Sequence, residues 1–145
     1  MKVLYKKLNV NAKVPSYGSS SAAGADLYAL LDSDITIQPN ETVLIHTGIA
    51  MQIPDGYVGL ICARSGLATK RGLAPANKVG VIDSDYRGEI MVALHNHSSH
   101  SAAISPFERI AQLMIVPYLT ADFTETNDLD NTERGSGGFG STGRK

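Results

Sequence analysis

The pattern of apolar and polar positions predicts a chain made mostly of short β-strands. Residues 57–63 are apolar on both faces, which is typical of a strand between two layers, and residues 109–116 predict another largely buried strand. Weaker alternation over residues 2–8 predicts an edge strand, whereas the polar residues 16–21 predict a loop. A short strand is expected after the small residues 22–25. Further strands, separated by Pro and Gly turns, are expected at 35–37, 42–46, 49–53, 79–82 and 89–94.

A single short helix is expected among these strands. Residues 65–71 suit a helix of about two turns, with Ser65 as its N-cap and Gly72 at its end. Pro75 prevents the helix from continuing. Many short strands, regular turns and one helix predict an all-β fold, a β-sandwich or jelly roll, in residues 1–120.

Composition places the chain among ordinary globular proteins. Its 145 residues suit one domain, with 43% hydrophobic and 19% charged residues. The net charge of −1 gives no overall basic field that would attract nucleic acid, and no apolar run approaches the roughly 20 residues of a membrane span. Cys62 is the only cysteine and lies in an apolar run, so a buried structural thiol and a cytoplasmic location are expected.

The C-terminal segment, residues 121–145, is polar and rich in glycine, which predicts a mobile tail and not a second domain. It contains the letters GxGxxG, but the chain ends too soon afterwards for a βαβ unit, so a dinucleotide site is rejected. Arg134, Ser141, Thr142 and free backbone N–H groups could instead wrap a polyphosphate. Phe139 offers a ring on which a base could stack. The alternative is a plain disordered Gly/Ser tail.

The most polar of the predicted turns lies in Gly80–Glu89, between two apolar runs. It contains Asp83, Asp85, Tyr86 and Arg87. Loops mounted on rigid strands often hold binding and catalytic groups. The plainer alternative is a surface hairpin in which Asp and Gly only make the turn.

Two other stretches have candidate chemistry. Arg64-Ser65-Gly66, at the predicted helix start, could hold an anion or could be an ordinary helix cap. Arg109 and Gln112 fall in a run expected to be buried, where polar side chains need partners. Those partners could be a ligand or, for Arg109, an acid such as Glu108 or Asp85.

His95, His97 and His100 raise the possibility of a zinc site, because alternate residues of a strand share a face. No nearby Cys or carboxylate completes a ligand set. Residues 96–101 are expected to form an exposed hairpin loop, so metal binding there is disfavoured.

Five segments together resemble the homotrimeric dUTPase family, the deoxyuridine triphosphate nucleotidohydrolases, and they occur in that family's order. They are Ala23–Leu27, Arg64–Ala68, Gly80–Glu89, Glu108–Leu113 and Arg134–Gly143. The resemblance implies a dUTPase-like β-clip of the jelly-roll type. It also implies a homotrimer whose active sites are each built from all three chains, with the arm 121–145 closing over a neighbour's site.

The activity that the resemblance implies is hydrolysis of dUTP to dUMP and pyrophosphate with Mg²⁺. This reaction limits uracil in DNA and supplies dUMP for dTMP synthesis. Asp83 would act as general base for in-line attack of water on the α-phosphorus, and a positioned base is commonly worth about 10² to 10⁴ in rate. Tyr86 would pack beneath the deoxyribose and leave no room for a 2′-hydroxyl. Asp26 would reach the Mg²⁺ through water, with the ion held mainly by substrate phosphates.

The resemblance also implies contacts to the base and to the phosphates. Those to the base are Asn77, the hairpin residues Gly80, Val81 and Ile82, Met91, and the stacking ring of Phe139. Those to the phosphates are Arg64, Ser65, Gly66, Gln112, Arg134, Ser141 and Thr142.

Two alternatives stay open at this point. A dCTP deaminase, or its bifunctional form, shares the fold and the trimer, but deamination needs a base near C4 of the pyrimidine, a glutamate in that family. No glutamate stands at a matching place. A non-enzymatic β-sandwich module would bind nucleotide without turnover.

Overall fold

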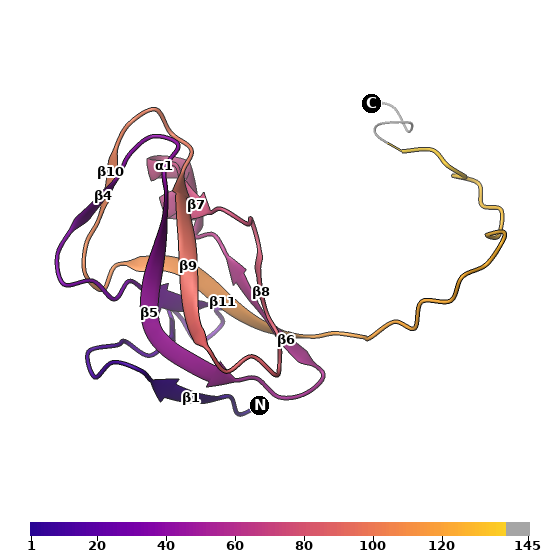
Figure 1. Cartoon of the computed structure of the whole chain (residues 1–145), viewed down its shortest axis with the longest axis horizontal. Helices are drawn as coiled ribbons and strands as arrows, with labels where there is room; N and C mark the ends of the chain where they lie inside the picture. Colours follow the sequence, from indigo (N-terminus) through magenta and orange to yellow (C-terminus); the bar gives the residue numbers. More distant parts are fainter. Residues whose placement is uncertain (139–145) are drawn as a thin grey trace.

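The computed structural model describes residues 1–138, which form a β body followed by a long extended segment (Figure 1). The expected all-β fold with one short helix is confirmed. The elements are β1 (Leu4–Lys7), β2 (Ser16–Tyr17), β3 (Ala25–Tyr28), β4 (Ile35–Ile37), β5 (Thr42–Gln52), β6 (Tyr57–Cys62), α1 (Ser65–Arg71), β7 (Leu73–Pro75), β8 (Gly80–Ile82), β9 (Glu89–Asn96), β10 (Ala102–Ile104) and β11 (Arg109–Pro117).

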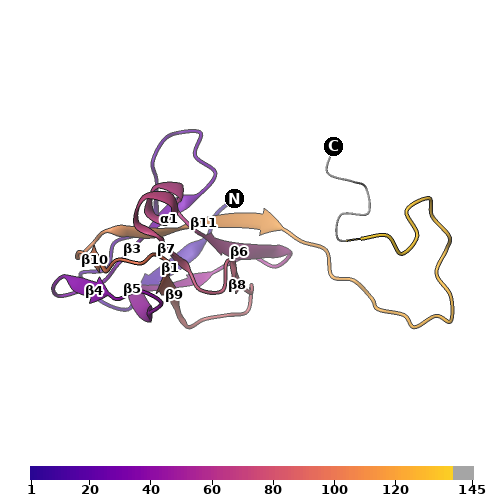
Figure 2. The ribbon, with the colours of Figure 1, turned by 90° about the horizontal axis from the view of Figure 1, so that it is seen from above.

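The strands form two main antiparallel sheets and a small pair. One sheet has the order β1-β5-β9-β7, the other the order β2-β3-β11-β6-β8, and β10 pairs with β4. Figure 2 shows β5 and β9 on one side of the body and β11 on the other. The predicted edge position of the N-terminal strand is confirmed, because β1 pairs only with β5.

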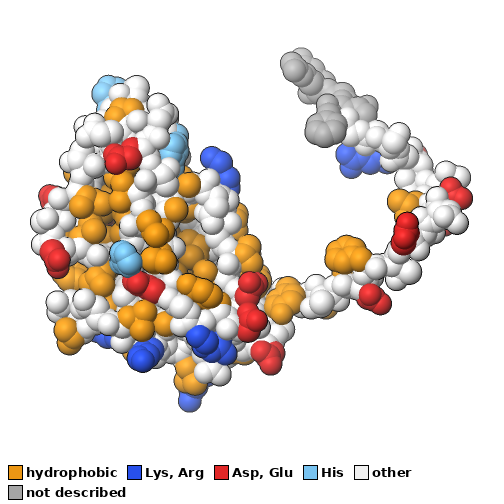
Figure 3. Space-filling model, viewed as in Figure 1, with side chains coloured by type: hydrophobic (Ala, Val, Ile, Leu, Met, Phe, Trp, Pro, Cys, Tyr) orange, Lys and Arg blue, Asp and Glu red, His pale blue; other side chains and the backbone are white. Residues whose placement is uncertain are grey.

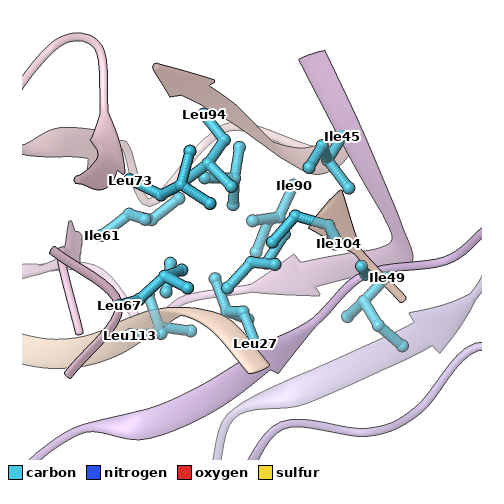
Figure 4. Close-up of a cluster of buried hydrophobic side chains, with 14 of the residues drawn as sticks. Leu27, Ile45, Ile49, Ile61, Leu67, Leu73, Ile90, Leu94, Ile104 and Leu113 are labelled. Carbon is cyan, nitrogen blue, oxygen red and sulfur yellow. The ribbon is translucent and has the colours of Figure 1, made fainter. Parts of the chain in front are cut away.

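The core lies between the two sheets and follows from alternation along the strands. In β9 every second side chain, Ile90, Val92 and Leu94, is fully buried. Leu113 of β11 and Leu67 of α1 belong to the same cluster (Figure 4). Burying one such side chain contributes about 1.5–3 kcal/mol, so this cluster holds the sheets and the helix in place.

β5 is one strand where the sequence predicts two. Its pairing with β9 shifts register between His46 and Ala50, so the strand continues through a bulge. Gly48 lies in the bulge with φ 68°, and a Cβ there would come within 2.7 Å of Ala12 Cβ and Leu30 Cδ2. The glycine that interrupts the apolar pattern therefore marks a bulge and not a strand end.

Three very short strands, β2, β7 and β10, are not predicted by the sequence pattern. β2 lies in the segment where a polar loop is expected. β7 ends at Pro75 and is the edge strand beside β9, a position in which a proline is tolerated. Each of these strands is a short extension of a sheet or pair whose partner is better defined by sequence.

The helix covers the expected residues but begins differently at its cap. Arg64 is the N-cap residue and makes no side-chain capping bond, while the expected cap, Ser65, is the first helical residue. Gly72 ends the helix in the left-handed region, with its N–H on Ala68 O at 3.2 Å. The cap prediction was wrong because the extended residue before the helix is Arg64, with φ −86° and ψ 125°, and its side chain pairs with Asp26.

Two burial predictions also need correction. Cys62 is half-buried and not fully buried, because the outward-facing positions of β6 are only partly covered. Asn96 was expected in an exposed loop, but it is fully buried at the end of β9. Its Nδ2 donates to Ile37 O and His100 O, and these bonds satisfy a polar side chain inside the fold.

Residues 118–138 contain no helix or strand and extend away from the body in Figures 1 and 3. Their large apolar side chains Leu119, Phe123 and Leu129 are almost fully exposed. No helix within residues 1–138 has the length and apolar character needed to cross a membrane.

Candidate active site

A pocket of about 310 Å³ opens beside the turn that joins β8 to β9. Its walls come from these two strands, from the turn and from the loop before β8, with one residue each from β5, β6 and β7. It brings together the expected base, sugar and catalytic residues of the described chain: Asn77, Gly80, Val81, Ile82, Asp83, Tyr86 and Met91. We call it the hairpin pocket. Phe139, the expected stacking ring, lies outside the described residues.

Backbone geometry holds the Tyr86 ring in this pocket. The Tyr86 N–H donates to Asp83 O at 3.2 Å and closes the turn. The Tyr86 hydroxyl donates to Glu89 O at 2.9 Å. A Cβ on Gly88 would overlap the Tyr86 ring, so the glycine leaves room for the ring to lie against the backbone. The ring is thereby fixed at both ends, although the side chain is 40% exposed.

Asp83 is exposed at the same turn, and its carboxylate has no hydrogen-bond or ion-pair partner within residues 1–138. Its oxygens are therefore available to a water molecule or ligand. Asn77 lies against Gly80, since a Cβ on that glycine would be 3.4 Å from Asn77 Nδ2. The pocket thus combines a free carboxylate, an amide and an aromatic ring.

Glu89, at the start of β9, also lines the hairpin pocket but was not predicted as a site residue. Its Oε1 accepts the Gly48 N–H at 2.7 Å, and its Oε2 lies 2.8 Å from His46 Nδ1. Burial raises the pKa of Glu89, but the hydrogen bonds and the charge of His46 outweigh burial, so the pKa lies below the usual 4.5. Glu89 is therefore held as an ionised hydrogen-bond acceptor.

A second pocket, of about 290 Å³, lies at the start of α1. It brings together the four expected phosphate contacts of the body: Arg64, Ser65, Gly66 and Gln112. Gln112 packs on Gly24, because a Cβ on that glycine would come within 2.7 Å of Gln112 Oε1. We call this the phosphate pocket.

Lys70 and Arg71 also line the phosphate pocket, although neither was predicted as a site residue. Arg71 is bonded to Glu108 and to Ala103 O, whereas Lys70 is exposed and has no ion pair among the described residues. They are adjacent in the last turn of the predicted helix, and this pair of cations in the sequence could have indicated a phosphate contact.

Asp26 lies behind the phosphate pocket between two arginines. The carboxylate is buried, with Oδ1 2.8 Å from Arg64 Nε and Oδ2 3.3 Å from Arg109 Nη1. The Arg64 contact is an ion pair and not an aligned hydrogen bond, since Nε has no hydrogen-bond partner among the described residues. Asp26 pairs with Gln112 across β3 and β11, which places the acid directly beside the pocket.

The expectation for Arg109 was therefore wrong in two respects. Its side chain is 50% exposed, and its acidic partner is Asp26 instead of Glu108 or Asp85. Arg109 is the first residue of β11 and is exposed, and its side chain reaches across to the neighbouring strand β3.

A magnesium ion fits this region only as a partner of a bound polyphosphate. Within residues 1–138 there is no cluster of three or more His, Cys, Asp or Glu side chains that could hold a metal. The Asp26 carboxylate already faces two guanidinium groups, which disfavours direct coordination of a further cation. Of the histidines, His95 Nδ1 lies 2.9 Å from Thr42 Oγ1, and His97 and His100 are exposed.

The hairpin pocket and the phosphate pocket have no lining residue in common. The first combines apolar walls with carboxylates, and the second is lined by three cations and one acid. Arg134 lies in the extended segment, where its Nε donates to Gly137 O at 3.0 Å. Ser141 and Thr142 lie outside the described residues. The described part of one chain therefore divides the expected site residues into three places.

Comparisons with known proteins are consistent across nearly the whole chain. The model of the dUTPase family matches residues 10–143. A deoxyuridine 5'-triphosphate nucleotidohydrolase of Hydrogenobaculum sp. (strain Y04AAS1) is 50% identical over 145 residues, 100% of both chains. One of Burkholderia ambifaria (strain MC40-6) is 49% identical over 132 residues, which are 90% of this chain and 89% of the relative.

Solved structures show the same similarity. The dUTPase of Staphylococcus bacteriophage 80alpha, solved with dUPNHPP, matches with a TM-score of 0.88 at 30% identity, covering 98% of each chain. The family match and the full-length relatives show that the chain belongs to the dUTPase family, and the solved phage structure shows that it has the same fold.

Proposed function

We propose that this chain hydrolyses dUTP to dUMP and pyrophosphate, by attack of water on the α-phosphorus with Asp83 as general base. The observation on which this rests is the hairpin pocket, which collects a free carboxylate, an aromatic ring and an amide in one cavity. The curated relatives are named for hydrolysis of this nucleotide, which supports the same substrate here.

The uracil ring enters the hairpin pocket against β8 and Asn77 in this proposal. β8 is an edge strand, so one side of its backbone has no neighbouring strand and can hydrogen-bond a ligand. Uracil presents an acceptor, a donor and an acceptor along one edge. Backbone N–H and C=O groups of Gly80, Val81 and Ile82, with the Asn77 amide and Met91, can match this edge and reject the amino group of cytosine.

Tyr86 and Asp83 then act on the sugar and on the attacking water. The Tyr86 ring, fixed between Gly88 and Glu89 O, occupies the space that a 2′-hydroxyl would need. Asp83 accepts a proton from the water as the water attacks the α-phosphorus, and pyrophosphate leaves on the opposite side. A positioned base contributes about 10² to 10⁴ in rate, and the rest comes from orientation and charge stabilisation.

The phosphates are held by Arg64, Ser65, Gly66 and Gln112, and in this proposal these residues come from a neighbouring copy. The absence of shared lining residues between the two pockets supports a site completed by assembly, as in a homotrimer. The arm 121–145 closes the site through Arg134, Phe139, Ser141 and Thr142. Residues 118–138 make a long extended segment, which gives the arm reach.

Mg²⁺ accompanies the triphosphate, with Asp26 reaching it through water. Bound in this way, the ion would neutralise charge on the phosphate oxygens. Arg64 and Arg109, which flank Asp26, hold the acid at the edge of the phosphate pocket. By supplying dUMP and removing dUTP, the reaction would limit uracil in DNA. The cytoplasmic location stays a prediction from the single cysteine.

The test is pyrophosphate release with Mg²⁺ from dUTP, dCTP, dTTP and UTP, for the wild type and Asp83→Asn. We expect turnover of dUTP only. The variant should lose about 10² to 10⁴ in kcat with little change in KM, because the amide keeps the shape of the carboxylate and cannot accept the proton. Full activity in Asp83→Asn would contradict the proposed role of Asp83 as general base. Ammonia release from dCTP would favour a deaminase.

A further inference from the structure

Glu89 closes a gap in the sheet that carries the hairpin pocket. At the bulge of β5, His46 pairs with Met91 and Ala50 pairs with Glu89, so Gly48 has no partner residue on β9. The Gly48 N–H is buried, and the Glu89 carboxylate accepts it at 2.7 Å. An unpaired buried N–H costs about 1–3 kcal/mol, so the side chain replaces a missing ladder bond.

The second oxygen of the same carboxylate fixes the other end of the bulge. Glu89 Oε2 lies 2.8 Å from His46 Nδ1. The bulge is also tied to its surroundings by backbone bonds, since Leu8 N donates to Gly48 O and Leu30 N donates to His46 O, each at 2.8 Å. Glu89 is thus anchored to a part of β5 that cannot shift without disturbing its neighbours.

The backbone of Glu89 connects this anchor to the ligand pocket. Its carbonyl oxygen accepts the Tyr86 hydroxyl at 2.9 Å. Glu89 follows Gly88, on which the Tyr86 ring lies, and all three residues belong to one short connection between β8 and β9. A displacement of Glu89 would therefore move the atom that holds the end of the ring.

We propose that Glu89 is a positioning residue for sugar discrimination. Its side chain locks the bulge of β5 to the first residue of β9, and the carbonyl of the same residue holds the Tyr86 hydroxyl. The class of ligand that it excludes is the pyrimidine ribonucleoside triphosphate, because a loosened ring would admit a 2′-hydroxyl. This inference rests on the proposed function, in which Tyr86 packs against deoxyribose.

The experiment compares kcat/KM for dUTP and for UTP in Glu89→Ala, Glu89→Gln and the wild type. Glu89→Ala removes both side-chain bonds and should lower the dUTP preference by about tenfold, the size expected from losing the support of one contact. Glu89→Gln keeps an oxygen that can accept the Gly48 N–H and an amide group beside His46 Nδ1, so it should keep the preference. A purely structural role would lower both values of kcat/KM together and leave their ratio unchanged.

Two further variants test the connection between Glu89 and the Tyr86 ring, and one of them serves if Glu89→Ala does not fold. Tyr86→Phe removes the hydroxyl that bonds Glu89 O, so it should lower the preference similarly, and Glu89→Ala should add nothing to it. His46→Ala cuts one of the two side-chain bonds at an exposed residue and should give an intermediate ratio even if Glu89→Ala does not fold.

The matched control is Glu41→Ala. Glu41 also accepts a backbone N–H, that of Gln38 at 2.6 Å, but it does not line the hairpin pocket. Its ratio should equal that of the wild type. A wild-type ratio in both Glu89→Ala and His46→Ala would overturn the inference and leave the proposed function intact. If the wild type did not hydrolyse dUTP at all, the result would contradict the proposed function itself.

Discussion

At the residue scale, two carboxylates of one hairpin differ in what surrounds them. Asp83 is exposed and has no side-chain partner within residues 1–138. Glu89 is mostly buried and accepts hydrogen bonds from Gly48 and from His46. A carboxylate with free oxygens suits proton transfer, whereas one whose oxygens are both bonded suits a structural or positioning role.

The lowered pKa of Glu89 predicts how stability depends on acid pH. Burial raises this pKa, but the bonds from His46 and Gly48 outweigh burial, so the pKa is lower in the folded protein than in the unfolded chain. The ionised form therefore stabilises the fold above the unfolded pKa of about 4.5, and this contribution is lost as pH falls through the folded pKa. Glu89→Gln cannot titrate, so its stability should fall less.

The measurement is the free energy of urea unfolding at neutral pH and at steps from about pH 5 to pH 3. Glu41→Gln is the control for removing an acid outside the pocket. Parallel curves for the wild type and Glu89→Gln would contradict the prediction.

At the element scale, the sequence predicts the longer strands, in which buried positions recur along the chain. Residues 57–63 and 89–94 have enough apolar positions to show a pattern, and they match β6 and most of β9. β2, β7 and β10 have only two or three residues each, too few to show a periodicity. They form because a neighbouring strand already offers free N–H and C=O groups.

The same distinction separates the site residues that the sequence indicates from those that it missed. Asp83 and Tyr86 belong to one turn, so their proximity follows from local sequence. Glu89 was missed because its partners, Gly48 and His46, are more than 40 positions away and meet it only across a bulge. Lys70 joins the phosphate pocket only through the direction of a short helix. The sequence also could not predict that these residues lie in two separate pockets, because that depends on how the chain folds.

Substitution of Gly48, in the bulge of β5, is expected to destabilise the fold. Gly48→Ala places a Cβ on a backbone with φ 68° and within 2.7 Å of Ala12 and Leu30. Strain and overpacking together should lower the free energy of unfolding by about 2–4 kcal/mol. The measurement is the urea midpoint, with the slope of the transition compared to confirm an unchanged unfolding reaction.

Gly56→Ala is the matched control, since Gly56 has φ 80° but no atom within 4 Å of an added Cβ. It isolates the cost of positive φ, about 1 kcal/mol. Equal losses in the two variants would show that packing against the bulge contributes nothing.

At the scale of the whole molecule, the chain is an incomplete enzyme in the proposed mechanism. The pockets for base and phosphate share no residue, and the segment after β11 leaves the body with its apolar side chains Leu119 and Phe123 exposed. Assembly of several copies would bring the pockets together and give the segment a surface to cover.

The last prediction tests whether the arm acts on a neighbouring copy. A chain that ends at residue 133 keeps Asp83 but lacks Arg134 to Lys145, and full-length Asp83→Asn keeps the arm but lacks the base. Each protein alone should fold and show almost no turnover. After mixing equal amounts in denaturant and refolding together, a site is intact when its Asp83 comes from the short chain and its arm from the full-length chain. Random assembly gives about half times half, so about a quarter of wild-type activity should return.

The refolded wild type sets the scale, and each variant refolded alone sets the background. If the arm closed over the pocket of its own chain, no combination of these two variants could place an arm beside an intact Asp83, and mixing would restore nothing. Restored activity that rises and falls with the mixing ratio, with its maximum at equal amounts, requires a site shared between chains. The extended path of residues 118–138 away from the body is what leads us to expect that result.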